Sequence, residues 1–197
     1  MGYTGFERLW LFFAFSFFGW VLETVTAAVR QRRFVNRGLV NGPFCVLYGI
    51  TGTAMLVVCR ELHGIWLFLG SMIFSTLAEW IAGHVIERMY HERWWDYSHM
   101  KWNLDGYICV PVSIVWGVLG AATMRWGAPV LVRVFRMLPR TPGHLIVWIL
   151  AAVLAMDVTA TLCILSGRSR RIRQWEGVDS WLTGVSSRLE RKIYGWV

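Results

Sequence analysis

Long apolar runs separated by short polar stretches make up the pattern of this chain. Roughly 20 helical residues cross a bilayer core of about 30 Å, and five runs approach or exceed that length. Because backbone N–H and C=O groups find no water in lipid, each run is predicted to be a helix. No run alternates as the strands of a membrane barrel do. The predicted spans are Leu9–Val29, Pro43–Cys59, Gly64–Tyr90, Tyr107–Trp126 and His144–Ser166.

The composition also indicates a membrane protein. Of the 197 residues, 56% are hydrophobic and 16% are charged, whereas soluble domains carry about 25% charged residues. These values, with a mean hydropathy of +0.46, exclude a disordered chain, a disulfide-rich secreted module and an ordinary water-soluble enzyme. The predicted fold class is all-α. Residues 1–166 are expected to form an integral membrane bundle of five transmembrane helices, and residues 167–197 an amphipathic cytoplasmic tail.

The basic residues predict how the chain lies in the cell membrane. The net charge is +8, but the arginines lie between apolar runs, so we expect contact with the bilayer and not with nucleic acid. If all five spans cross, 14 of the 20 basic residues fall on one side. That side is the cytoplasm by the positive-inside rule, which places the N-terminus outside and the C-terminus inside. The tail, rich in Arg and Trp, is expected to lie on the inner leaflet, with docking to a partner as the alternative.

The connection between the fourth and fifth spans is the exception to this rule. Four of its arginines fall outside in the five-span topology. Residues Val130–Leu138 are therefore interpreted as an interfacial helix, with Arg133 and Arg136 reaching the lipid headgroups.

Several ionisable residues lie inside the predicted spans, where a charge costs about 2.5–3.5 kcal/mol on insertion scales. Glu23 and Glu79 are interpreted as proton-linked or ion-paired groups, with a buried structural network as the alternative. Asp157 has threonines nearby and is interpreted as a contact between helices.

A metal site is the other role that some of these residues could have. His84, Glu87 and His91 share one helix face and have the ligand types of zinc or non-haem iron. The two histidines are about 10 Å apart along the helix axis, so one ion does not readily bind both. We therefore predict no metal and no cofactor.

Three short sequence strings stand out along the chain. They are S-F-F-G-W-V-L-E at Ser16–Glu23, N-R-G-L-V-N-G-P-F-C-V-L-Y-G at Asn36–Gly49, and W-D-Y-S at Trp95–Ser98. Together they resemble the putative type IV ABC-transporter permease family, also called the CmpB family, over roughly residues 6–120. Val46 stands where the family usually has a proline. The resemblance implies a multi-pass membrane protein of a transport system.

In the predicted topology every one of these strings falls in the cytoplasmic half of the membrane. Such convergence predicts a polar cavity that opens to the cytoplasm or the inner leaflet. Gly42-Pro43 is expected to start a helix whose free N–H groups face an anion, helped by Arg37. Individually, Gly42-Pro43 also fits a plain helix start, and Trp95 and Tyr97 also fit an interfacial aromatic belt. The candidate cavity residues are Glu23, Asn36, Arg37, Tyr48, Glu79, His84, Glu87, Asp96, Tyr97 and Asn103.

Three functions compete for this cavity. A transporter membrane subunit ranks first, and because no P-loop motif occurs, it needs a separate ATPase subunit. The chain is small for a permease, so a homo-oligomer is expected. An intramembrane enzyme acting on a lipid ranks second, with Glu23, Glu79 and His84 as acid–base groups and Arg37 on a phosphate. A structural or regulatory subunit is the third.

The topology can be tested by labelling two introduced cysteines in intact cells. A cysteine at Thr4 should react with an impermeant reagent added outside, whereas one at Ser98 should be protected, because an odd number of crossings separates them. Reaction of both cysteines from the same face would show that the number of crossings is wrong by one.

Overall fold

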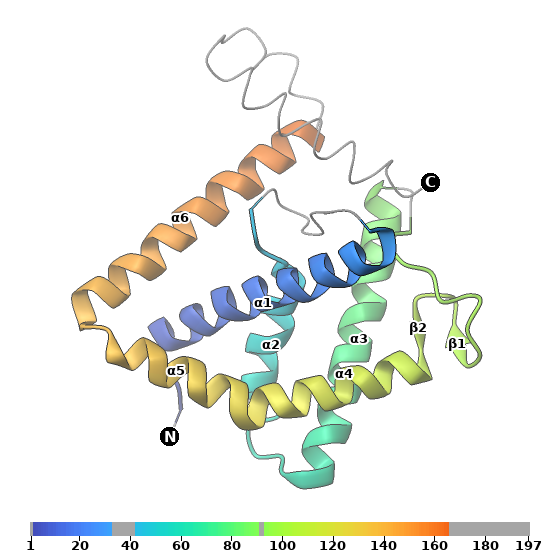
Figure 1. Ribbon diagram of the computed structural model, residues 1–197, viewed down its shortest axis with the longest axis horizontal. Helices are drawn as coiled ribbons and strands as arrows, with labels where there is room; N and C mark the ends of the chain where they lie inside the picture. The colour runs from blue at the N-terminus through green and yellow to red at the C-terminus, as the bar shows by residue number, and fades with distance from the viewer. Residues whose placement is uncertain (1, 33–41, 91–92, 166–197) are drawn as a thin grey trace, which may run out of the picture. The chain divides into compact units, whose positions relative to one another are not determined.

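The computed structural model describes residues 2–32, 42–90 and 93–165, and its elements are almost all helices (Figure 1). The predicted all-α class is confirmed. Two candidates of the cavity, Asn36 and Arg37, lie outside the described residues, as do His91 and the tail 167–197. The helices are α1 (Gly5–Gln31), α2 (Val46–Val58), α3 (Gly64–Tyr90), α4 (Val110–Ala122), the π-helical turn η1 (Thr123–Gly127), α5 (Ala128–Met137) and α6 (Arg140–Leu165).

Four helical stretches are long and apolar enough to cross a membrane. They are Gly5–Val29, Gly64–Arg88, Val110–Met137 and Arg140–Cys163. Helix α2 has 13 residues, which gives it a length of about 20 Å at 1.5 Å per residue. A helical membrane bundle is therefore confirmed, while the crossing by α2 stays a prediction.

Two predicted spans start too early. The second was predicted from Pro43, but α2 begins at Val46. The fourth was predicted from Tyr107, but α4 begins at Val110, because the residues before it form a short antiparallel hairpin. The hairpin pairs β1 (Asn103–Leu104) with β2 (Ile108–Cys109), a short element that the sequence analysis did not predict.

The hairpin turns at Asp105-Gly106. Both residues have positive φ angles, 53° and 75°, and the Tyr107 N–H donates to the Leu104 carbonyl at 3.1 Å. Asp-Gly is a favoured pair in hairpin turns whose two central residues both have positive φ, because glycine adopts positive φ without a steric cost. The strands hold only two residues each, too few to produce a visible alternation in the sequence.

The chain divides into two compact units, residues 50–137 and residues 1–49 with 138–197. In the unit 50–137, α3 and α4 pack against each other, and α4 crosses α3 in the view of Figure 1. Gly117 and Gly120 of α4 face α3 so closely that a Cβ atom at Gly120 would lie 2.9 Å from the Cβ of Ser71. Small residues at such a contact let helix backbones approach closely in lipid, where packing replaces the hydrophobic effect.

Helices α4 and α5 follow one another without a loop. The Ala128 N–H donates to the carbonyl of Thr123, five residues back, and the helix axis changes direction at this π-helical turn (Figure 1). One extra residue in a helical turn is an established cause of such a bend. The predicted interfacial helix Val130–Leu138 is therefore helical, but it begins at Ala128 as the continuation of α4.

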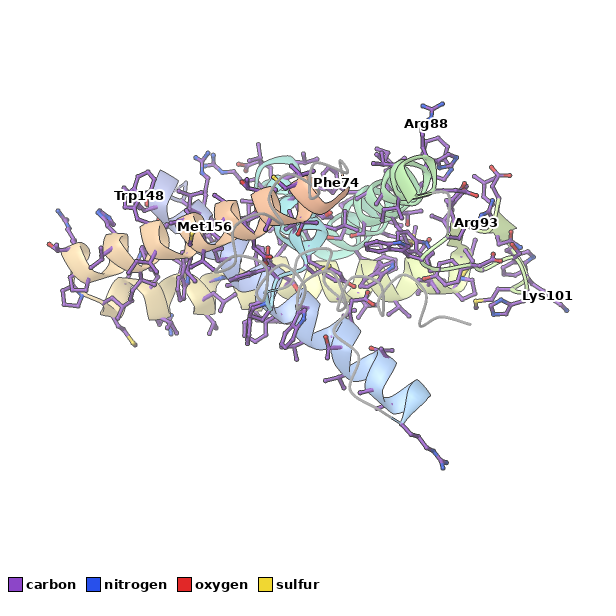
Figure 2. All side chains as sticks on the ribbon, turned by 90° about the horizontal axis from the view of Figure 1, so that it is seen from above. Phe74, Arg88, Arg93, Lys101, Trp148 and Met156 are labelled. Atoms are coloured by element: carbon purple, nitrogen blue, oxygen red, sulfur yellow. The ribbon has the colours of Figure 1, made fainter. Side chains whose placement is uncertain are left out.

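The second unit contains α1, the residues before α2, and α6. A capping box starts α1: the Thr4 N–H donates to Glu7 at 2.7 Å, and the Glu7 N–H donates to the Thr4 hydroxyl at 3.3 Å. Helix α6 packs beside α1, where the rings of Phe6 and His144 stack at 3.7 Å. Trp148 of α6 also contacts Phe6, with ring centres 6.3 Å apart, although its side chain and that of Met156 are largely exposed (Figure 2).

Candidate functional site

Four residues that precede α2, Gly42–Cys45, form a non-helical segment between α1 and α6. The Gly42 N–H donates to the Asp157 carboxylate of α6 at 2.6 Å. The Cys45 N–H donates to the Ser16 carbonyl of α1 at 2.8 Å, and the Phe44 N–H donates to the Gly42 carbonyl. Pro43 has no N–H to satisfy. Every backbone donor of the Gly42–Cys45 segment thus has an acceptor without a helix.

The partners of this segment place it well inside the apolar helices. Ser16 lies near the middle of the apolar stretch Gly5–Val29, and Asp157 lies within Arg140–Cys163. Both are buried, with 0% and 8% of their surface exposed. Non-helical backbone at such a level is tolerated only where protein groups satisfy it, which is what Asp157 and the Ser16 carbonyl do.

This arrangement corrects the expectation of free N–H groups at Gly42-Pro43. No helix starts there, and the Gly42 N–H already donates to a side-chain oxygen of the chain's own Asp157. Asp157 was expected to be a contact between helices and was not among the candidate cavity residues. Its carboxylate instead holds the segment that leads into α2.

Glu23 and Tyr48, both predicted site residues, are brought together next to this segment. The Tyr48 hydroxyl donates to Glu23 at 2.6 Å. Gly19 makes room for the tyrosine, because a Cβ atom there would lie 2.2 Å from the Tyr48 ring. Both side chains are half-buried. The Tyr48 hydroxyl thus gives the Glu23 carboxylate a hydrogen-bond donor within the apolar helices.

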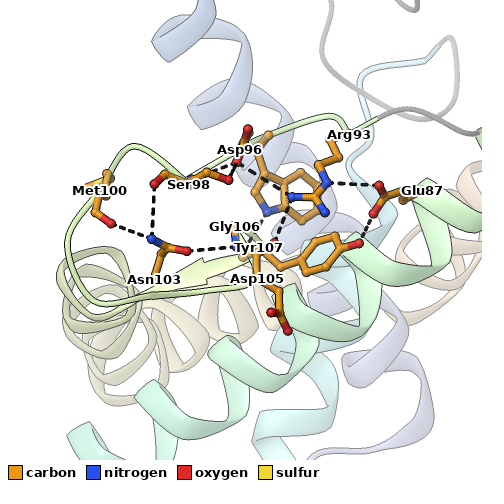
Figure 3. Close-up of polar contacts among 10 residues, drawn as sticks. Glu87, Arg93, Asp96, Ser98, Met100, Asn103, Asp105, Gly106 and Tyr107 are labelled. Atoms are coloured by element: carbon orange, nitrogen blue, oxygen red, sulfur yellow. Dashed lines mark hydrogen bonds and ion pairs between the residues drawn. The ribbon is translucent and has the colours of Figure 1, made fainter.

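Three further predicted residues, Glu87, Asp96 and Asn103, belong to a network of polar contacts that includes Arg93, in the loop after α3 (Figure 3). The Arg93 guanidinium bonds Glu87 of α3 at 3.1 Å and the Asp105 carbonyl at 2.9 Å. Its charge also lies 4.6 Å from the centre of the Tyr107 ring, a cation–π distance. The Tyr107 hydroxyl in turn donates to Glu87. Arg93 and Tyr107 thereby fasten the hairpin to α3.

The W-D-Y-S string completes this attachment. The Tyr97 hydroxyl donates to Glu79 of α3 at 3.1 Å, and the Tyr97 N–H donates to the Gly106 carbonyl at 2.8 Å. The Trp95 indole N–H donates to the Tyr107 carbonyl at 2.9 Å.

Asn103 closes the turn from the other side of the loop. Its side-chain N–H donates to the Met100 carbonyl at 2.7 Å, and its oxygen accepts the Gly106 N–H at 3.1 Å (Figure 3). Asn103 thus closes residues 93–109, called here the hairpin loop, on themselves, while Tyr97, Arg93 and Tyr107 link this loop to the second half of α3.

Asp96 stabilises the turn of the hairpin loop. Two hydrogen bonds from Ser98, and then the charges of Arg93 and His99, hold the pKa of the Asp96 carboxyl below its usual range. A carboxyl with a lowered pKa stabilises the folded loop at pH values above its unfolded pKa of about 3.9. That stabilisation is lost as the pH falls through the lowered value.

The structure gives His84 aromatic neighbours. Its ring lies 4.3 Å from that of Trp80 and 4.0 Å from that of Tyr107, and its Nδ1–H donates to the Trp80 carbonyl at 2.9 Å. Glu87 is bonded to Arg93 and Tyr107. Among the described residues no three His, Cys, Asp or Glu side chains come together as a metal site.

The predicted residues thus form two groups. Glu23 and Tyr48 belong to one compact unit, and Glu79, His84, Glu87, Asp96, Tyr97 and Asn103 belong to the other. The single cavity expected to join both groups stays a prediction. Arg93, Tyr107 and Asp157 were missed as site residues: the arginine was counted only as a loop charge, and the tyrosine as the start of a span.

Comparison with known families gives one match. The sequence model of a family described as "Putative ABC-transporter type IV" matches residues 10–162. No curated protein and no solved structure matches the chain.

The Asp157 contact can be tested with Cys45 as a reporter, in a chain whose other cysteines, Cys59, Cys109 and Cys163, are changed to alanine. Asp157→Ala leaves the Gly42 N–H without its acceptor, at a cost of about 1 kcal/mol. That cost corresponds to a roughly fivefold faster reaction of Cys45 with a maleimide, if modification follows local opening. Asp157→Asn keeps an acceptor oxygen and should leave the rate within about twofold of the parent. Equal rates in the alanine variant and the parent would contradict the contact.

Proposed function

We propose a function from one premise: this chain belongs to the family of putative type IV ABC transporters, whose model matches residues 10–162. It is accordingly a membrane protein related to ABC transport. We propose that it is the membrane-spanning permease subunit of such a transporter and works with a separate ATPase subunit. Membership of the family is the observation that carries this proposal.

The charges support a topology with five crossings, in which the N-terminus is outside and the C-terminus is cytoplasmic. If α2 crosses, 14 basic residues lie on one side and six on the other. If α2 does not cross, the same residues divide into eleven and nine. Only the first division has the asymmetry that orients membrane proteins.

Helix α2 is short, but it is long enough to complete a crossing because it starts near the middle of the apolar part of α1. The Gly42–Cys45 segment lies at the level of Ser16, near the middle of the apolar part of α1. About half of a 30 Å bilayer core, some 15 Å, then remains to be crossed. The 13 residues of α2 cover about 20 Å.

A helix that begins at mid-membrane after unwound backbone is a common element of transporter binding sites. We therefore propose that the Gly42–Cys45 segment borders the substrate pathway, next to the Glu23–Tyr48 pair. In this proposal Glu23 binds a proton or a cationic group of the substrate, and Tyr48 stabilises its charged form. Asp157 keeps the segment in the conformation that the pathway requires.

The hairpin loop is proposed to face the cytoplasm and to contact the ATPase. Its exposed side carries Arg93, Lys101 and His99, and Figure 2 shows Arg88 pointing outward at the end of α3. The hydrogen bonds and the Arg93–Glu87 ion pair described above attach this loop to α3 or close it on itself. Movement of a docked ATPase would therefore be transmitted to α3 without being absorbed by a flexible loop.

Purification of the tagged chain from its own cells tests this proposal. An ATPase should co-purify, and the complex in proteoliposomes should hydrolyse ATP. Glu23→Gln removes a charge-assisted hydrogen bond worth about 1.5–3 kcal/mol, so ATP hydrolysis coupled to the membrane subunit should fall roughly tenfold or more.

Glu61→Gln serves as the matched control, because Glu61 is an exposed acid in the turn before α3. It should leave ATP hydrolysis unchanged. A chain that purifies without an ATPase would contradict the transporter proposal. A Glu23→Gln variant that is equally active but less stable would assign the Glu23–Tyr48 pair a structural role instead.

A further inference from the structure

Helix α5 has three distinct faces. At 100° per residue, Ala128, Val132 and Phe135 share an arc of about 60°, and these three side chains are buried. Arg133 and Arg136 occupy the next arc, also of about 60°, and both are exposed. The third arc carries the exposed apolar side chains Val130, Val134 and Met137.

Neither hydrocarbon alone nor water alone suits both exposed faces of α5. If α5 lay in the hydrocarbon, its two arginines would be charges in lipid, which is strongly unfavourable. If α5 lay in water, it would expose a stripe of valine and methionine, with Met137 75% exposed. A helix at the surface of the bilayer satisfies both faces, because the apolar side chains contact acyl chains while the arginines reach the headgroups.

The π-helical turn η1 supplies the required change of direction. Residues Val110–Trp126 span about 26 Å at 1.5 Å per residue, close to the thickness of the bilayer core. The bend then turns α5 away from the axis of α4 (Figure 1). Trp126, 65% exposed, lies at the bend, where tryptophans anchor helices at the membrane surface. Arg125, also exposed, precedes it.

We propose that Arg125, Arg133 and Arg136 form a binding surface for the phosphate groups of anionic lipids, called here the α5 arginine surface. Guanidinium groups bind phosphate oxygens in pairs and carry their charge at every physiological pH. The exposed apolar stripe beside the arginines holds the acyl chains of the same lipids. This inference does not rest on the proposed transport function.

Lipid titration of the full-length chain in detergent, followed by native mass spectrometry, tests the α5 arginine surface. The unmodified chain should bind phosphatidylglycerol more tightly than phosphatidylcholine. The triple variant Arg125→Gln, Arg133→Gln, Arg136→Gln should lose roughly tenfold or more of that preference, since each surface arginine contributes to anionic lipid binding. The matching triple lysine variant keeps the charge and should retain most of the preference.

The double variant Arg8→Gln, Arg60→Gln is the control, because both arginines lie outside α5 and are exposed. It should bind like the unmodified chain. An unchanged preference in the triple glutamine variant would overturn the proposal. So would an equal loss in the control, which would indicate a response to net charge alone.

A second measurement does not depend on the folding of the arginine variants. Nitroxide labels are attached to the single-site variants Val130→Cys, Val115→Cys and Glu61→Cys in phosphatidylglycerol bilayers, and their accessibility to oxygen and to a nickel chelate is compared. The label at 130 should lie at intermediate depth, below the headgroups but shallower than the label at 115 in α4. A label at 130 as deep as that at 115, or as exposed to water as that at 61, would overturn the surface position of α5.

Discussion

The hydrogen bond from the Gly42 N–H to the Asp157 carboxylate is the contact on which the account of this site depends. Inside a bilayer, a backbone donor outside a helix must find a protein acceptor. Asp157 supplies it from α6, and the Ser16 carbonyl supplies another from α1. These two acceptors allow α2 to begin beside the middle of α1. The position of α2 in turn places Tyr48 against Gly19 and within reach of Glu23.

Residues of the strings that resemble the family make packing and hydrogen-bond contacts of this kind. Gly19 and Tyr48 belong to different strings, and the absence of a side chain at Gly19 is what admits the Tyr48 ring. In the W-D-Y-S string, Trp95 and Tyr97 fasten the hairpin loop, and Asp96 closes its turn. These residues therefore have structural roles that are visible in the chain itself. A role in transport for Glu23 is a proposal added to that packing.

The helices were predictable from sequence because the apolar run that marks each one is long. Spans such as Gly64–Tyr90 extend over many residues, and α3 has the bounds that hydropathy alone predicted. The start of α2 and the hairpin were not predictable in this way. The hairpin contains two residues per strand, and its stability comes from side chains such as Arg93 that lie outside it. Asp157 was visible as an acid in an apolar helix, but its partner is a backbone N–H 115 positions away, which no local pattern indicates.

The depth of Cys45 tests the central claim most directly, since the claim is that α2 starts inside the membrane. A small fluorophore on Cys45, in a chain without other cysteines, is reconstituted with lipids brominated at different depths. The same fluorophore on a Ser16→Cys variant provides the reference for the level of mid-α1. If α2 starts inside the membrane, lipids brominated deep in the acyl chains should quench both positions most strongly. Quenching of Cys45 at headgroup depth, with Ser16→Cys still deep, would contradict this claim.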